Sequence, residues 1–127
     1  MTAATNRPLE GLSVLVAEDS WHLADAMRIT IERAGGKVVG LAGTLEEAEK
    51  VAETATFDAA VMDLNLHGRL AHDLVQQLAG KGTKVIVLTG YEPPTTLLDK
   101  VHDCLTKPVS VEVLIASLGR PLRGRQA

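Results

Sequence analysis

The residues LSVLVAEDS, at positions 12–20, carry the strongest signal for the architecture, because a continuous apolar run stops at two adjacent carboxylates. The run from Leu12 to Ala17 is typical of a strand that is buried on both faces of a sheet. Glu18 and Asp19 follow it directly, and two neighbouring carboxylates repel each other unless a cation lies between them. The stretch therefore predicts a parallel-sheet strand with a cation site at its carboxyl end.

Outward from this stretch, short β-rich runs alternate with longer stretches of helical period. The further predicted strands are residues 38–42, 59–63, 84–88 and 102–105. Helices are predicted after Ser20, after Thr44, over Leu70 to Leu78, as a short segment near Thr96 to Lys100, and after Ser110. Parallel crossovers are right-handed and each needs a covering helix, so we expect an α/β fold with a doubly wound, five-stranded parallel sheet.

Capping signals and apolar stripes support these helices. Thr44 and Glu47 have the spacing of a capping box. Apolar positions recur at helical spacing, which predicts the buried face of each helix. The residues expected to face inward are Leu23, Met27, Thr30, Ile31 and Ala34; Leu45, Ala48, Ala52 and Ala55; Leu74, Val75 and Leu78; and Val111, Leu114, Ile115 and Leu118.

Composition limits the classes of function. The chain has 127 residues, a formal net charge of -3 and 46% hydrophobic residues, which suits one globular domain and gives no reason to expect nucleic-acid binding. We expect a single domain over 1–127 with a core at about 11–118, short polar tails and no output domain. A single cysteine, Cys104, fits a reducing compartment, and the sequence shows neither a signal peptide nor an apolar run of membrane-spanning length. The expected location is the cytoplasm.

Polar residues stand where further strands end. Asp63 closes the third predicted strand, and Thr89 and Lys107 follow the fourth and fifth. Ligands of open parallel sheets bind beyond the carboxyl ends of the strands, so these side chains should meet there. A carboxylate so placed can attack phosphorus, a lysine can neutralise phosphoryl oxygens and a threonine hydroxyl can donate to them. We predict that Asp63 is the phosphoacceptor and that Pro108 fixes the approach of Lys107 through a cis peptide bond.

The same edge of the sheet suits magnesium, which prefers oxygen ligands and retains water molecules. Asp19 and Asp63 suit direct coordination, and Glu18 suits contact through a water molecule. The backbone carbonyl of Asn65 could supply another oxygen. Each of these residues alone would be read as a turn former or helix cap, and their conjunction carries the prediction.

Four segments together resemble the response-regulator receiver domain: Val16 to Ser20, Met62 to Gly68, Val87 to Gly90 and Leu105 to Pro108. The resemblance extends from about Leu12 to Leu118. It implies a flavodoxin-like (βα)5 fold and Mg²⁺-dependent transfer of a phosphoryl group to Asp63. The donor would be a sensor histidine kinase or a histidine phosphotransfer protein. The chain would then be a phosphoacceptor and not an enzyme with a separate substrate, acting as a monomer or weak dimer without nucleic-acid or membrane contacts.

The chain departs from the receiver pattern in two places. Cys104 occupies the position of the usual switch aromatic, and the stretch between Thr89 and Lys107 is short, so the fourth helix should be short or irregular. Thr89, Gly90 and Tyr91 resemble a subgroup named for a Phe-Ala-Thr-Gly-hydrophobic-Tyr (FATGUY) motif, although Val87 and Leu88 replace its Phe-Ala. That resemblance implies a stand-alone receiver in a bacterial stress-response phosphorelay.

Our hypothesis for signalling is that phosphorylation draws Thr89 inward and reorders the loop that carries Tyr91. Gly90 would lend that loop backbone freedom. The alternative is that Tyr91 only packs on the surface. The signal would leave by protein contact, through the first helix with the loop after Lys107 or through residues 91–104, unless the domain serves as a phosphate sink or carrier.

Two other classes of function remain open. A receiver-like interaction module that works without phosphorylation is disfavoured by the complete acidic, hydroxyl and lysine set. A flavin or dinucleotide carrier is disfavoured because Glu18, Asp19 and Ser20 stand where a glycine-rich phosphate loop would be. The histidines show no zinc-site spacing, and among them His67 is the one placed to touch the site; the four are His22, His67, His72 and His102.

Overall fold

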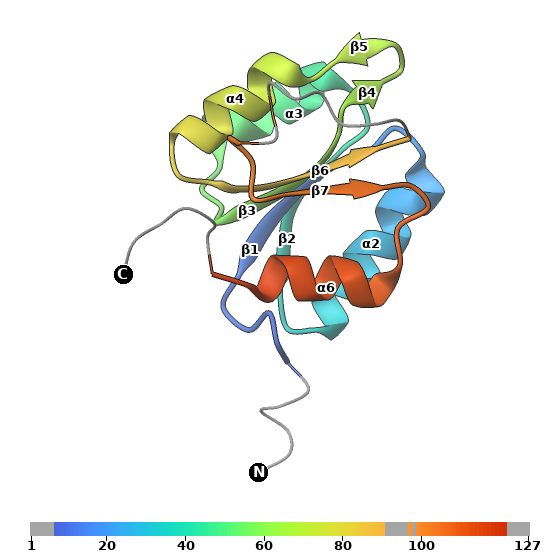
Figure 1. The fold of residues 1–127 in the computed structure, drawn as a ribbon, viewed down its shortest axis with the longest axis vertical. Helices are drawn as coiled ribbons and strands as arrows, with labels where there is room; N and C mark the ends of the chain where they lie inside the picture. Colours follow the sequence, from blue (N-terminus) through green and yellow to red (C-terminus); the bar gives the residue numbers. More distant parts are fainter. Residues whose placement is uncertain (1–6, 91–96, 98, 122–127) are drawn as a thin grey trace.

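A computed structural model of the chain describes residues 7–90, 97 and 99–121. Within them, five strands form a parallel sheet in the order β2-β1-β3-β6-β7 (Figure 1). The strands are β1 (Ser13–Ala17), β2 (Lys37–Ala42), β3 (Ala59–Asp63), β6 (Lys84–Thr89) and β7 (Asp103–Thr106). The chain turns back past β1 after β2, so this is the doubly wound parallel sheet that the sequence predicts.

Helices cover both faces of the sheet (Figure 1). Helices α2 (Trp21–Arg33) and α6 (Val111–Gly119) pack on one face, and α3 (Leu45–Thr54) and α4 (His72–Gly80) pack on the other. Alternate residues of β1 point to opposite faces: Val14 and Val16 join the α2 and α6 core, and Leu15 joins the α3 and α4 core. This two-sided burial explains why the strand is apolar from Val14 to Ala17.

Side-chain caps fix where the helices begin. The hydroxyls of Ser20 and Ser110 accept hydrogen bonds from backbone N–H groups three residues on, at 3.4 and 3.1 Å, as expected of N-caps. The predicted capping box differs in one bond. Thr44 Oγ1 accepts from the N–H of Glu47, but the Glu47 carboxylate accepts from the N–H of Gly43, one residue before the cap.

The helix predicted over Leu70 to Leu78 begins later, at His72, and its predicted inner residues are buried. Leu70 belongs instead to β5 (Arg69–Leu70), which pairs antiparallel with β4 (Asn65–Leu66). A turn at residues 67–68 joins the two short strands. The prediction for Leu70 is wrong because this hairpin extends from the loop after β3, and Leu70 is left exposed on it.

The structure differs from the prediction at Val111 of α6, and it describes only part of the short segment predicted before β7. Val111 was expected to face inward but is 53% exposed, and Ser117 is buried instead. Val111 lines a groove together with residues of α2, which is why its side chain is not covered by the sheet. The short helix predicted near Thr96 to Lys100 falls partly outside the described residues, because positions 96 and 98 are not among them. Leu97 is buried, and its carbonyl accepts hydrogen bonds from the N–H groups of Lys100 and Val101.

Polar side chains of β6, of β7 and of the residue before β7 hold the C-terminal end of α6. Lys84 Nζ donates to the carbonyl oxygen of Leu118 at 2.7 Å, and His102 Nε2 lies 2.8 Å from the carbonyl oxygen of Ser117. Asp103 accepts from the Ser117 hydroxyl at 2.8 Å and pairs with Arg120. Burial opposes the charged carboxylate, but the hydrogen bonds outweigh it and hold the pKa of Asp103 below its ordinary value.

We expect Asp103→Asn to lower the free energy of unfolding by about 1–2 kcal/mol at neutral pH, because the variant loses charge-assisted hydrogen bonds. A depressed folded-state pKa contributes stability above the unfolded pKa, near 3.8, and this contribution is lost as the pH falls through the folded value. Urea denaturation at pH 7 and near pH 3 should therefore show the gap between variant and wild type closing in acid. An equal gap at both pH values contradicts this account, and the exposed Asp99→Asn serves as control.

Candidate functional site

The carboxyl ends of β1, β3, β6 and β7 lie together at one edge of the sheet (Figure 1). Asp63 pairs in register with Leu88, and the next residue of β6, Thr89, pairs with Thr106. Glu18 continues β1, because its N–H donates to the carbonyl of Ala42 in β2. The parallel register thus brings the predicted acidic, hydroxyl and lysine positions to one place, although they are far apart in sequence.

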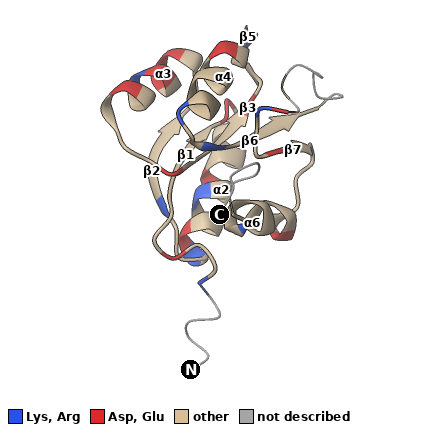
Figure 2. Ribbon diagram, turned by 60° about the vertical axis from the view of Figure 1, so that its left-hand side comes forward, with Lys and Arg blue, Asp and Glu red and all other residues tan. Residues whose placement is uncertain are grey.

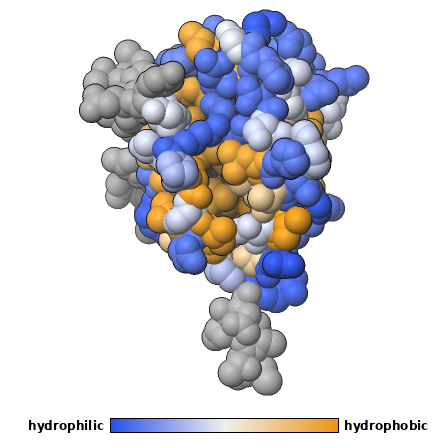
Figure 3. Space-filling model, turned by 90° about the vertical axis from the view of Figure 1, so that its right-hand side faces the viewer, coloured by the Kyte–Doolittle hydropathy of each residue, from blue (hydrophilic) through white to orange (hydrophobic). Residues whose placement is uncertain are grey.

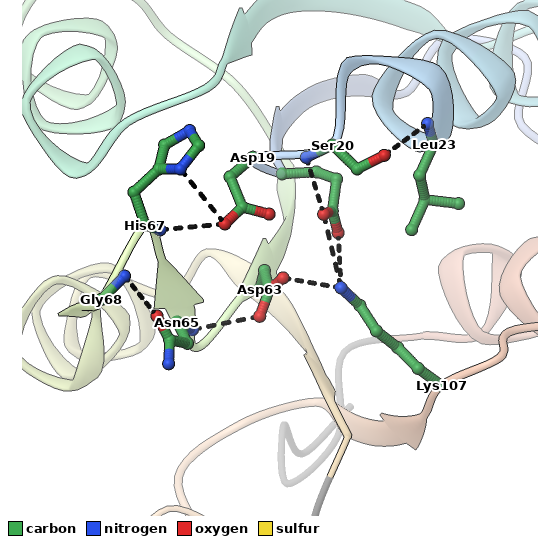
Figure 4. A network of polar contacts seen from close by, with 9 residues as sticks. Asp19, Ser20, Leu23, Asp63, Asn65, His67, Gly68 and Lys107 are labelled. Carbon is green, nitrogen blue, oxygen red and sulfur yellow. Dashed lines mark hydrogen bonds and ion pairs between the residues drawn. The ribbon is translucent and has the colours of Figure 1, made fainter.

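Lys107 joins two of the carboxylates. Its Nζ donates to Asp63 Oδ2 at 2.7 Å and lies 3.0 Å from Glu18 Oε1 and 3.3 Å from Glu18 Oε2 (Figure 4). Burial disfavours the lysine's charge, but its contacts with Asp63 and Glu18 outweigh this and raise the pKa of Lys107. The lysine is therefore held as a cation against the carboxylate that we predict to accept phosphorus.

Glu18 is the most deeply buried acid of the site, with 1% of the residue exposed. Burial raises the pKa of Glu18, although the N–H of Ser20 and the Lys107 ammonium both favour its charged form. Its Oε1 has no aligned hydrogen bond even though Lys107 Nζ is 3.0 Å away. A buried carboxylate oxygen in this condition has capacity left for a cation or a water molecule.

The carboxylate of Asp19 is held by the hairpin after β3. The main-chain N–H of His67 donates to Asp19 Oδ2 at 2.9 Å, and the His67 ring Nδ1 is 3.9 Å away (Figure 4). This backbone hydrogen bond is the largest cause of the lowered pKa of Asp19. In the same loop, the N–H of Asn65 donates to Asp63 Oδ1 at 3.0 Å, and the N–H of Gly68 donates to the Asn65 side-chain oxygen at 2.7 Å.

The donor set fits a hard divalent cation. Glu18, Asp19 and Asp63 each offer a carboxylate oxygen, and the three oxygens lie within 4.8 Å of one another. Three carboxylates face one lysine, so negative charge remains after the ion pairs are counted, and oxygen-only donors are what magnesium prefers. The unsatisfied Glu18 Oε1 points to the same conclusion. The backbone carbonyl of Asn65 as a ligand stays a prediction.

The other predicted residues surround this group. Thr89 is buried at the end of β6, and its carbonyl oxygen accepts from the N–H of Lys107 at 2.8 Å. The Lys107–Pro108 peptide bond is cis, as predicted. Cys104 is half-buried in β7 and packs against the α3 and α4 core, and Gly90 is exposed. Tyr91, and with it the proposed signalling loop, lies outside the described residues.

Sequence reasoning missed how His67 contributes. The prediction placed its side chain near the site, whereas the structure shows that its main-chain N–H makes the close contact. His67 and Gly68 both have positive φ, 53° and 82°, which is the signature of a tight hairpin turn. The dipeptide His-Gly between Leu66 and Arg69 was the signal in the sequence that could have revealed the hairpin.

Residues 14–119 match the family model described as the response regulator receiver domain. The match covers most of the chain, and the chain therefore belongs to the response regulator receiver domain family. Its described residues form the five-stranded parallel sheet and bring together the acidic cluster and Lys107. Within the described residues, no helix combines the length and apolar character needed to span a bilayer.

Individual relatives agree with this membership. The transcriptional regulatory protein PdtaR of Mycobacterium tuberculosis is 29% identical over 111 residues, which are 83% of this chain and 54% of PdtaR. The chain thus spans about half the length of this curated relative. A Burkholderia pseudomallei response regulator, whose crystal structure contains a phosphorylated aspartic acid, a calcium ion and citrate, is 29% identical with a TM-score of 0.74, over 84% of this chain and 66% of that one.

A Francisella receiver domain, that of response regulator 1452, is 25% identical with a TM-score of 0.74, over 85% of this chain and 93% of that one. The non-phosphorylated HemR receiver domain of Leptospira biflexa, at 22% identity and a TM-score of 0.77, covers 91% of this chain and 98% of its own. The second likeness supports the fold alone.

Proposed function

We propose that this protein is a phosphoacceptor: Asp63 receives a phosphoryl group from the phosphohistidine of a histidine kinase or histidine phosphotransfer protein. The observation that carries the proposal is the 2.7 Å contact between Asp63 and Lys107 beside two further carboxylates. Ion pairs that serve stability alone do not require two extra acids at the same point, because the added charges repel. The phosphorylated aspartate of the Burkholderia relative supports the same chemistry.

Each residue has a defined task in the transfer. An oxygen of Asp63 forms the bond to phosphorus while the bond between phosphorus and the donor imidazole nitrogen breaks, and the released imidazole takes up a proton. Lys107 moves its ammonium contact from the aspartate to the phosphoryl oxygens, and the Thr89 hydroxyl donates to one of them. Asp19, Asp63 and, through water, Glu18 would hold Mg²⁺, and the bound ion would supply positive charge to neutralise the phosphoryl oxygens.

Small-molecule phosphorylation tests the proposal. The purified chain is incubated with acetyl phosphate, with magnesium chloride or with a chelator, and its intact mass is followed over time. We expect one phosphoryl group with magnesium and none with the chelator. A protein that binds magnesium and stays unmodified would instead support the alternative of an interaction module that works without phosphorylation.

An apolar groove between α2 and α6 supports a protein partner for this transfer. The groove has a volume of about 120 Å³, and Figure 3 shows a hollowed apolar area on this side of the molecule. Figure 2 shows acidic residues along α3, on the other side of the sheet from the groove. The groove residues are Leu23, Ala26, Met27, Thr30, Val109, Ser110, Val111 and Leu114. We propose that a helix of the phosphodonor docks here, next to the loop after Lys107.

We expect Val111→Glu to slow phosphotransfer from a phosphorylated histidine kinase about tenfold, because an apolar contact is replaced by a charge at the rim of the groove. Its rate with acetyl phosphate should not change, since Asp63 and Lys107 are untouched. The measurement is transfer of radiolabelled phosphate from a kinase core that phosphorylates the wild type. Leu41→Glu, an exposed apolar residue on the edge strand β2, is the matched control; equal effects of both variants would contradict groove docking.

The likeness of Thr89, Gly90 and Tyr91 to the FATGUY subgroup supports a narrower proposal. The receiver would act as a stand-alone phosphorelay component in a stress response and would pass its signal by protein contact. Phosphoryl transfer to the isolated chain, followed by capture of a partner only in the phosphorylated state, tests this role.

A further inference from the structure

In the hairpin after β3, the backbone N–H of His67 belongs to a residue with a left-handed conformation and points out of the hairpin toward Asp19. His67 has φ 53° and Gly68 has φ 82°, so both central residues of the turn lie in the left-handed region, which a non-glycine residue seldom enters. The turn connects the paired residues Leu66 and Arg69. Because the left-handed conformation sets where the His67 N–H points, the turn directs this group away from the hairpin and toward Asp19, 48 positions earlier in the chain.

The hairpin is anchored at both of its ends. Near β3, the N–H of Asn65 donates to Asp63, and Asn65 in turn accepts from the N–H of Gly68 across the turn. On the other strand, Arg69 forms an ion pair with Glu46 of α3. The turn is thus tied to the phosphoacceptor by one strand and to a neighbouring helix by the other.

Among the three acids of the site, Asp19 is the one whose side chain is least fixed by burial. Glu18 is fully buried and Asp63 nearly so, whereas the Asp19 side chain is 27% exposed. Repulsion from the two neighbouring carboxylates favours rotation of Asp19 toward water. A carboxylate has two oxygens, so one can accept the N–H of His67 while the other remains for a cation.

We propose that His67 is a positioning residue of the magnesium site, and that its main-chain N–H, aimed by the left-handed turn, holds Asp19 in the orientation that binds the cation. The inference rests on the proposed function, because it presupposes the magnesium site. The imidazole ring is not required: it is 65% exposed and its nearest nitrogen is 3.9 Å from the carboxylate. The turn, the backbone donor and the acid therefore act as one unit.

Magnesium affinity of three variants tests this assignment. His67→Pro removes the N–H and cannot adopt a positive φ, His67→Gly keeps both the N–H and the left-handed conformation, and His67→Val keeps the N–H but resists that conformation. All three remove the ring equally. Affinity is measured on the unphosphorylated protein by titrating magnesium chloride and following the fluorescence of Trp21, two residues beyond Asp19 and 69% exposed.

We expect magnesium to bind His67→Pro about tenfold more weakly than the wild type, as is usual when the partner of a metal ligand is lost. His67→Gly should bind within about twofold of the wild type, and His67→Val should lie between the two. If His67→Pro binds magnesium as tightly as the wild type, the inference about His67 is wrong but the proposed function is unaffected. The same holds if His67→Gly loses as much magnesium affinity as His67→Pro does. A wild type that binds no magnesium overturns the magnesium site of the proposed function as well.

A second measurement uses only the metal-free wild type, so it does not depend on whether His67→Pro folds. In the metal-free wild type, hydrogen exchange followed by NMR should show the His67 amide protected, because it donates to Asp19. Exchange of this amide at the rate of an unprotected one contradicts the proposal, whatever the variants do.

Discussion

Asp63→Asn should abolish phosphoryl transfer to this protein and leave its fold intact. The amide has no nucleophilic carboxylate oxygen, yet its carbonyl can still accept the hydrogen bond from the N–H of Asn65. The variant also relieves repulsion between Asp63 and the buried Glu18, so the lost Lys107 contact is partly offset. Intact mass after incubation with acetyl phosphate and magnesium should show no phosphoryl group, because the nucleophile is gone.

Asp73→Asn is the matched control for this experiment. Asp73 is an exposed aspartate in the first turn of α4, so its replacement changes charge in the same way without touching the site. This variant should be phosphorylated at the wild-type rate. Undiminished phosphorylation of Asp63→Asn would show that another residue accepts the phosphoryl group.

Lys107→Met should lower both stability and phosphorylation. Methionine has nearly the length of lysine, but it leaves the buried Glu18 facing Asp63 without the ammonium that lies 3.0 Å from Glu18 Oε1. Removing one partner of a buried ion pair destabilises by about 3 kcal/mol, and loss of one group that stabilises transition-state charge slows a reaction about a hundredfold. The measurements are urea denaturation and the rate of phosphorylation by acetyl phosphate, each at neutral pH.

Magnesium should restore part of the stability that Lys107→Met loses, because a cation among the three carboxylates compensates charge in place of the ammonium. The exposed Lys100→Met is the control and should behave as the wild type does. A Lys107→Met variant as stable as the wild type would mean that the ion pairs around Glu18 contribute little to the folded state.

Where the sequence had a strong periodic or capping signal, it predicted the architecture to within a residue or two. The β3 strand has the predicted bounds, and Ser20 and Ser110 cap their helices as expected. The site could also be predicted, because parallel register places the carboxyl ends of the strands at one edge and leaves Asp63 and Lys107 little freedom to separate.

The predictions that failed depend on local backbone conformation and on packing between helices. Leu70 fits the apolar pattern of α4. However, the left-handed turn at His67 reverses the chain, so that Leu70 pairs with Asn65 in a hairpin instead. Val111 fits an inward stripe, but it faces the groove beside α2. The contact between Asp19 and the N–H of His67 involves a backbone group that every residue type except proline has, so side-chain chemistry alone could not identify it.

We claim that Asp63, and no other residue, becomes phosphorylated. Borohydride reduces an aspartyl phosphate to homoserine, so reduction of the protein phosphorylated with acetyl phosphate and magnesium, followed by peptide mass spectrometry, locates the modified residue. We predict homoserine at position 63 and at no other aspartate. Homoserine elsewhere, or a phosphoryl group that stays on a histidine and yields no homoserine at position 63, would contradict the claim.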